Sequence, residues 1–178
     1  AAYNAPHYPM VSHARFQRQY AQLPQPRRNY AAMVAGLDES IGVIMKRLGE
    51  LELTNDTLVF FTSVNGAADP SPRGEGGGRN APYREFKRSL FEGGIHMPAI
   101  ISWPGRVPAG ETRDQVAISM DLFPTVAEVA EPALPSGLVI DGRSWMPFLR
   151  DPSKPGQEIV FFEWEGQQAV REGKWKVV

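Results

Sequence analysis

The chain has 178 residues, a formal net charge of −1 and no cysteine. Basic and acidic residues are interspersed, which argues against binding to nucleic acid or to an anionic membrane. No apolar run approaches the roughly 20 residues that span a bilayer, and the lack of cysteine excludes a disulfide, a thiolate nucleophile or a zinc–sulfur site within this sequence. The length suits one domain with a sizeable buried core.

The first regular element that the sequence predicts is a long amphipathic helix over residues 29–49. Asn29 is expected to cap its N-terminus, with Pro26 just outside. Lys46 and Arg47 lie near the negative end of the helix dipole. Apolar residues recur at steps of three and four, which places them on one helical face: they are Tyr30, Val34, Leu37, Ile41, Ile44 and Leu48.

Two short apolar runs predict strands at residues 57–63 and 98–103. The segments TLVFFTS and PAIISW show no alternation of polar and apolar residues. Such runs are typical of strands covered on both faces, as in a parallel sheet flanked by helices. We therefore expect the centre of the chain to contain a sheet of this kind.

The last third of the sequence predicts further elements. Residues 121–130 resemble a helix with Asp121 as its cap and Pro124 in its first turn. One more helical turn is expected at residues 145–149, followed by a strand at 158–164 and a hairpin that turns near Glu172 and Gly173. The predicted fold class is α/β with an antiparallel end, and we expect the fold to be incomplete at both ends of the chain.

The end of the first predicted strand is a candidate site. Ligands of open α/β sheets collect at the carboxyl ends of parallel strands, and Ser63-Val64-Asn65-Gly66 occupies such an end. Asn65 offers a neutral carbonyl oxygen, which is a suitable ligand for a hard cation. The alternative is that Asn-Gly simply forms a turn, and the tetrapeptide by itself favours the turn.

A second candidate cluster lies between a glycine-rich loop and the next strand. In FKRSLFEGGIHMP, Lys87 is a mobile positive charge suited to an oxyanion, and two adjacent glycines permit close approach of the backbone. His7, in a Pro-His-Tyr-Pro loop, can donate a hydrogen bond to an anion or act as an acid. Taken singly, both residues fit better with solvated loop positions, and Glu92 fits a cap or a hydrogen bond inside the turn.

A series of short motifs follows His7 along the chain. After the long helix come S-x-N-G, K-x-x-x-x-E-G-G-I-x-x-P, W-P-G, D-L-F-P-T, D-G-x-S and V-R-x-G-K-W-K. This series resembles the sulfatase family, within the alkaline-phosphatase-like superfamily, over residues 3–178. The resemblance implies a mixed sheet flanked by helices, with residues 1–150 as part of a sulfatase catalytic domain and residues 151–178 as the start of a C-terminal antiparallel subdomain.

The resemblance also implies roles for three residues. His7 matches the histidine that contacts the sulfate ester, and Lys87 matches the lysine that binds the sulfate oxygens. Asn65 matches the asparagine ligand of the active-site divalent cation, usually calcium. The implied substrate is an organic sulfate, either a sulfated small molecule or a glycan, whose cleavage develops negative charge that preorganised cations and donors stabilise. A periplasmic or secreted location is expected from the same resemblance.

Two features depart from the family pattern. The family normally has S-D-N-G, and here Val64 replaces the carboxylate metal ligand with an isopropyl group. The family nucleophile is a formylglycine made from Cys or Ser in C-x-P-S-R or its serine counterpart, and this sequence has no such segment. Ser71-Pro72-Arg73 has its proline directly after the serine rather than two residues on. We therefore expect a degraded calcium site and no formylglycine in this chain.

Two functional hypotheses remain open from the sequence. The first is the C-terminal portion of an arylsulfatase-like sulfuric ester hydrolase, inactive in isolation. The second is a degenerate sulfatase-like module that binds sulfated ligands through Lys87 and His7 without turnover. A phosphoester hydrolase of the same superfamily fits less well, because those enzymes do not usually combine E-G-G-I-x-x-P with D-L-F-P-T.

Overall fold

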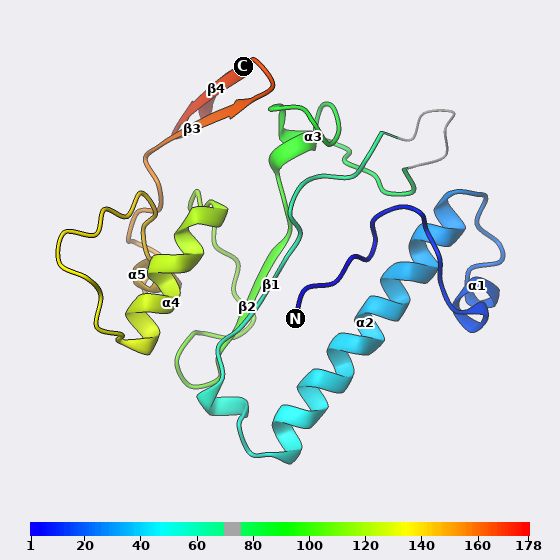
Figure 1. Ribbon diagram of the computed structural model, residues 1–178, viewed down its shortest axis with the longest axis horizontal. Helices are drawn as coiled ribbons and strands as arrows, with labels where there is room; N and C mark the ends of the chain where they lie inside the picture. Colours follow the sequence, from blue (N-terminus) through cyan, green and yellow to red (C-terminus); the bar gives the residue numbers. More distant parts are fainter. Residues whose placement is uncertain (70–75) are drawn as a thin grey trace. The chain divides into compact units, whose positions relative to one another are not determined.

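The computed structural model describes residues 1–69 and 76–178 and confirms an α/β chain (Figure 1). The described residues form two compact units. One comprises Ala1–Ile101 with Trp164–Gln167, and the other comprises Ser102–Glu163 with Gln168–Val178. The division expected from the sequence, at residue 150, stays a prediction. No helix in the described ranges is both long and apolar enough to cross a membrane.

The long helix forms as predicted, with a different N-terminus. α2 spans Arg27–Glu50, and α1 spans Ala14–Gln19 and packs against it (Figure 1). The cap of α2 is Pro26 and not Asn29, so the predicted cap is wrong. The side-chain oxygen Oδ1 of Asn29 instead accepts hydrogen bonds from the side-chain amides of Gln17, at 2.9 Å, and Gln25, at 3.0 Å. These contacts tie the helix start to the segment that contains α1.

The two central strands form at the predicted places. β1 spans Val59–Thr62, after the 3₁₀ turn η1 at Thr54–Asp56, and β2 spans Ala99–Ser102. They are neighbours in a two-stranded sheet. The hydroxyl of Thr62, at the end of β1, donates to the carbonyl of Pro98, just before β2, at 3.0 Å.

This contact shows that β1 and β2 run in opposite directions (Figure 1). The expectation of a parallel arrangement is therefore wrong for this pair. The expectation that both faces are covered also fails, since Thr62 is exposed and Ile100 is 62% exposed. A two-stranded sheet has too few neighbours to cover every apolar side chain. The carboxyl end of β1 thus meets the short segment that leads into β2, which contains helix α3 at Glu92–Ile95.

The second unit has a core built around α4 and α5. α4 spans Leu122–Ala130 with Asp121 as its cap, as predicted, and follows the 3₁₀ turn η2 at Ser119–Asp121. α5 spans Met146–Arg150, one helical turn as expected. The buried apolar side chains of this unit are Trp145, Met146, Phe148, Leu149, Val160 and Ala169.

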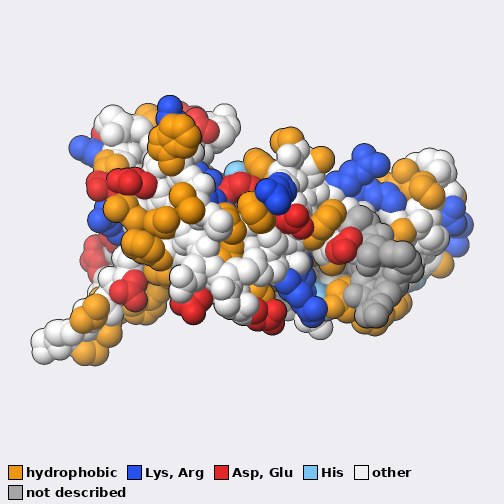
Figure 2. Space-filling model, turned by 90° about the horizontal axis from the view of Figure 1, so that it is seen from above, with side chains coloured by type: hydrophobic (Ala, Val, Ile, Leu, Met, Phe, Trp, Pro, Cys, Tyr) orange, Lys and Arg blue, Asp and Glu red, His pale blue; other side chains and the backbone are white. Residues whose placement is uncertain are grey.

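The C-terminal strands form the small antiparallel sheet that the sequence predicts. β3 spans Ile159–Trp164, β4 spans Gln167–Glu172 and β5 spans Trp175–Val177, in the order β3-β4-β5. The β4–β5 hairpin pairs Glu172 with Trp175 across the turn, so the predicted hairpin is confirmed. Several apolar side chains of β3 and β5 are exposed: Ile159, Phe161, Trp164, Trp175 and Val177. Figure 2 shows that hydrophobic side chains also lie among the polar ones on one face of the molecule.

Candidate functional site

Two of the residues singled out from the sequence lie in contact. The Nζ atom of Lys87 is 3.0 Å from the Nε2 atom of His7, although the residues are 80 positions apart. Both belong to the same compact unit. Within the described residues no ion pair joins Lys87 to a carboxylate. The first unit therefore presents a lysine and a histidine together, with the positive charge of the lysine available to an anion.

The partners of His7 determine which ring nitrogen carries the proton. Its Nδ1 atom lies 2.6 Å from the carbonyl oxygen of Tyr8, which can only accept a hydrogen bond, so Nδ1 is protonated. The ammonium of Lys87 can only donate, so Nε2 is the acceptor and carries no proton. The ring is also stacked on that of Tyr8, with centroids 4.3 Å apart. His7 is thus a neutral imidazole whose orientation is fixed on both sides.

The loop around Lys87 has a constrained backbone. Glu85 and Arg88 have φ values of 67° and 76°, a region that residues with a side chain seldom adopt. The backbone N–H of Lys87 donates to the carbonyl of Ala67 at 3.0 Å. Left-handed residues persist where the surroundings hold them, and such positions cluster at functional sites. The backbone of Lys87 therefore lies between two left-handed residues and is bound to the backbone of Ala67.

The two adjacent glycines of the predicted cluster have a steric role. A Cβ atom on Gly93 would lie 2.0 Å from the carbonyl oxygen of Glu85, and one on Gly66 would lie 1.9 Å from the carbonyl oxygen of Gly93. The backbone N–H of Gly66 also donates to Gly94 at 2.9 Å. Only glycine permits backbones to approach this closely. The backbones of the segment after β1, the Lys87 loop and α3 are consequently packed in direct contact at these glycines, a group of contacts that we call the glycine stack.

Asn65 lies at the end of β1 as predicted. Its side-chain Nδ2 atom donates to the backbone carbonyl of Gly66 at 2.7 Å, and the backbone carbonyl of Asn65 accepts from the hydroxyl of Ser63 at 3.0 Å. The nitrogen end of the amide is thus engaged locally, and the oxygen end is the one that can bind a cation. No hydrogen bond between described residues joins Asn65 to His7 or Lys87, so its place in the same site stays a prediction.

The residues that surround this strand end do not form a complete metal site. Val64 is 87% exposed, and its isopropyl group can neither coordinate nor neutralise a dication. Among residues 1–69 and 76–178 no group of three or more His, Cys, Asp or Glu side chains could hold a metal ion. One amide oxygen does not fit the shell of roughly six to eight oxygens that calcium requires. Ser71-Pro72-Arg73 lies outside the described residues.

Sequence reasoning missed one residue of this region. The side chain of Asn80 makes three hydrogen bonds to backbone groups, two with Ala67 and one with Glu85. It therefore connects the segment after β1 to the loop that carries Lys87. The sequence offered only a weak signal, because an asparagine before Ala-Pro reads as an ordinary turn residue.

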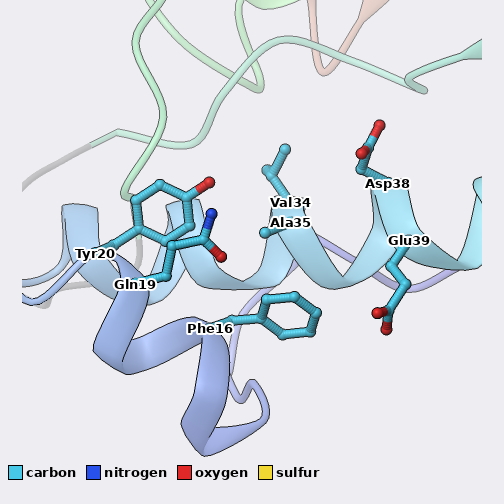
Figure 3. Close-up of a pocket in the computed structure, with 7 residues that line it drawn as sticks. All are labelled: Phe16, Gln19, Tyr20, Val34, Ala35, Asp38 and Glu39. Atoms are coloured by element: carbon cyan, nitrogen blue, oxygen red, sulfur yellow. The ribbon is translucent and has the colours of Figure 1, made fainter.

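A pocket elsewhere in this unit does not suit an anion. It has a volume of about 390 Å³ and lies between α1 and α2 (Figure 3). Two of its lining residues, Asp38 and Glu39, are acidic, and Glu39 is paired with Arg15. None of the three candidate site residues, His7, Asn65 and Lys87, lines it. The candidate anion site is accordingly the Lys87–His7 pair, in which His7 is exposed and Lys87 half-buried, and not this pocket.

Comparison with known proteins places these motifs in a family. Residues 1–132 match the family model described as Sulfatase. The chain is 41% identical over 138 residues to the steryl-sulfatase of Homo sapiens, covering 76% of this chain and 24% of that protein. It is 39% identical over 150 residues to the N-acetylgalactosamine-6-sulfatase of Canis lupus familiaris, covering 84% of this chain and 28% of that protein. The chain spans about a quarter of the length of these curated relatives.

Solved structures extend the similarity along almost the whole chain. Ps i-CgsB, solved in complex with k-i-k-neocarrahexaose, has 29% sequence identity and a TM-score of 0.85, covering 98% of this chain and 39% of its own. The PsFucS1 sulfatase from Pseudoalteromonas sp. has 26% identity and a TM-score of 0.80, covering 97% of this chain and 34% of its own. With the family model matching most of its residues, the chain belongs to the sulfatase family and has the alkaline-phosphatase-like α/β fold.

Proposed function

We propose that this chain supplies part of the active site of a sulfuric ester hydrolase, in which Lys87 and His7 bind the sulfate group of an organic sulfate ester. The observation that supports this most strongly is the 3.0 Å contact between the two side chains. Two nitrogen-bearing groups from distant segments converge there on an exposed surface. Family membership supports the same role, because the relatives compared above are sulfatases.

The chemistry of the pair suits a sulfate group. Sulfate-ester cleavage places negative charge on the sulfuryl oxygens, and preorganised donors stabilise that charge. Lys87 can turn its ammonium from His7 to a sulfate oxygen without moving the backbone. His7 can then donate from Nε2 once that atom has gained a proton, while its Nδ1–H stays bound to Tyr8. Both groups would contact the ester directly.

The family implies two further groups, calcium and formylglycine. Calcium would supply charge stabilisation at the sulfate oxygens, and formylglycine would supply the nucleophile. The described residues do not fit a complete calcium shell, as Val64 and the lone Asn65 show, and the sequence contains no cysteine. We accordingly propose no step through either group, and propose that the 178-residue chain by itself does not turn over substrate.

A second candidate function is a sulfatase-like module that binds sulfated ligands without catalysis. The observation that favours it is Val64, which occupies the place of a family carboxylate and points into solvent. The Lys87–His7 pair would serve such a module equally well. The ligand in either case would be a sulfated small molecule or glycan, and a periplasmic or secreted location is proposed from the family.

An assay with p-nitrophenyl sulfate tests the proposal. The 178-residue chain should release no p-nitrophenol above background, with or without added calcium. Metal-dependent release that Lys87→Ala abolishes would contradict the proposed inactivity and reveal a working site. Release that survives Lys87→Ala would indicate a contaminating sulfatase. The longer protein of the family type, with the same Lys87→Ala change, should lose turnover if the catalytic hypothesis is correct.

A further inference from the structure

Asn80 connects two backbone segments through its side chain. Its Oδ1 atom accepts from the N–H of Ala67 at 2.8 Å, and its Nδ2 atom donates to the carbonyl of the same residue at 3.1 Å. The Nδ2 atom also donates to the carbonyl of Glu85 at 3.1 Å. Every polar atom of the amide is thus used, and all three bonds go to backbone.

The two segments are those that set the position of Lys87. The carbonyl of Ala67, held by Asn80, is also the acceptor for the backbone N–H of Lys87 at 3.0 Å. The carbonyl of Glu85, also held by Asn80, belongs to a residue with a φ of 67°. A single amide side chain therefore fixes the strained residue two positions before Lys87 and the acceptor of Lys87 itself.

We propose that Asn80 is a positioning residue, which holds the Lys87 loop so that the ammonium meets His7 and an incoming sulfate group. This inference rests on the proposed function of the Lys87–His7 pair. Asn80 does not need to touch the sulfate, because its effect passes through the backbone of Ala67 and Glu85. A loop that must be ordered on binding costs affinity, and preorganisation removes that cost.

Two substitutions test the proposal through the binding of inorganic sulfate to the full 178-residue chain. Asn80→Ala removes all three hydrogen bonds. Asn80→Asp keeps nearly the same size and the acceptor for Ala67, but replaces both donors with oxygen facing two carbonyls. Sulfate titration followed at the imidazole resonances of His7 should show a dissociation constant roughly three- to tenfold higher for Asn80→Ala, equivalent to about one net hydrogen bond, and at least as high for Asn80→Asp.

A matched control separates positioning from general stability. Asn29 also accepts two side-chain hydrogen bonds, from Gln17 and Gln25, in the same unit. Asn29→Ala should lower the melting temperature and leave the sulfate affinity of the folded chain unchanged. An Asn80→Asp chain that binds sulfate like the parent, or an Asn80→Ala chain that loses only melting temperature as the control does, overturns the proposal.

Hydrogen exchange on the parent chain provides a measurement that needs no variant. The hydrogen bonds made by the backbone N–H groups of Ala67 and Lys87 should break in the same opening event, because Asn80 joins the two segments. The two amides should therefore give the same free energy of opening. Independent opening of the two amides overturns the proposal. If calorimetric titration shows that Lys87→Ala and His7→Ala leave sulfate binding unchanged, the proposed function fails. If they weaken binding and the Asn80 variants do not, only the positioning role fails.

Discussion

The carboxylate of Asp121 accepts a hydrogen bond from the indole Nε1 of Trp145 at 3.0 Å, and both side chains are almost fully buried. The same carboxylate accepts from the backbone N–H groups of Ile118 and Arg143 and from the amide of Gln157. The D-L-F-P-T and D-G-x-S motifs therefore meet in one hydrogen-bonded cluster in the second unit.

Removing this carboxylate should destabilise the second unit strongly. Asp121→Ala leaves the buried indole N–H of Trp145 and three part-buried donors without this acceptor, and an unsatisfied buried donor costs about 1–3 kcal/mol. We expect a loss of at least about 2 kcal/mol in the free energy of unfolding, measured by urea denaturation. The control is Asp114→Ala, at an exposed position of the same unit. Equal unfolding midpoints for the two variants would show that the Asp121 cluster contributes little.

His7 should contribute to sulfate binding through its Nε2 atom. In the free chain this atom lies 3.0 Å from the ammonium of Lys87, so a sulfate group held by Lys87 lies next to it. His7→Gln should therefore weaken sulfate binding, measured by calorimetric titration. Equal affinities for the His7→Gln chain and the parent chain would contradict the proposed role of Nε2.

The glycine stack gives a steric prediction. Gly93→Ala places a Cβ atom 2.0 Å from the carbonyl oxygen of Glu85, so the backbone must shift. Overpacking of this kind typically costs about 1–3 kcal/mol, and it should also weaken sulfate binding because the Lys87 loop moves. Gly42→Ala is the matched control, since nothing lies within 4 Å of its added methyl group. Because Gly42 is in a helix, Gly42→Ala should raise the free energy of unfolding by up to about 1 kcal/mol, measured by thermal denaturation. If Gly93→Ala also stabilised the chain, the close backbone contact at Gly93 would be wrong.

Calcium binding should be weak in this chain and respond little to Val64→Asp. The added carboxylate and Asn65 supply two ligands, whereas calcium takes roughly six to eight oxygens. Calorimetric titration of parent and variant should therefore give dissociation constants in the millimolar range or no binding. In a longer chain that supplies the remaining ligands, the same substitution should strengthen binding far more. An unchanged affinity there would show that position 64 does not face the metal.

The predictable part of the fold followed from local patterns. Step-three and step-four periodicity located α2, unbroken apolar runs located β1 and β2, and Asp121 before Leu-Phe-Pro located α4. The direction of β1 against β2 was not predictable in this way. Strand direction depends on which residues pair across the sheet, and neither apolar run specifies its partner residues. The Thr62–Pro98 hydrogen bond, which the structure shows, determines the direction.

The candidate site shows a similar division. His7 and Lys87 were found because each belongs to a recognisable motif, and the structure brings the two side chains together. Asn80 was missed because its role lies in contacts with backbone groups 13 and 5 positions away. A side chain that acts on distant backbone leaves no periodic signal, and Asn before Ala-Pro has a simpler interpretation as a turn.

Titration of inorganic sulfate into the parent chain, Lys87→Ala and Lys46→Ala tests the central proposal most directly. Lys46 is exposed on α2, with its ammonium 3.8 Å from the carboxylate of Glu50. Lys46→Ala is the matched control, because it changes the net charge of the chain by the same amount as Lys87→Ala. The proposal predicts that Lys87→Ala abolishes the perturbation of the His7 resonances while Lys46→Ala leaves it intact. Equal weakening by both variants, or unchanged binding in Lys87→Ala, would contradict a specific sulfate site at Lys87 and His7.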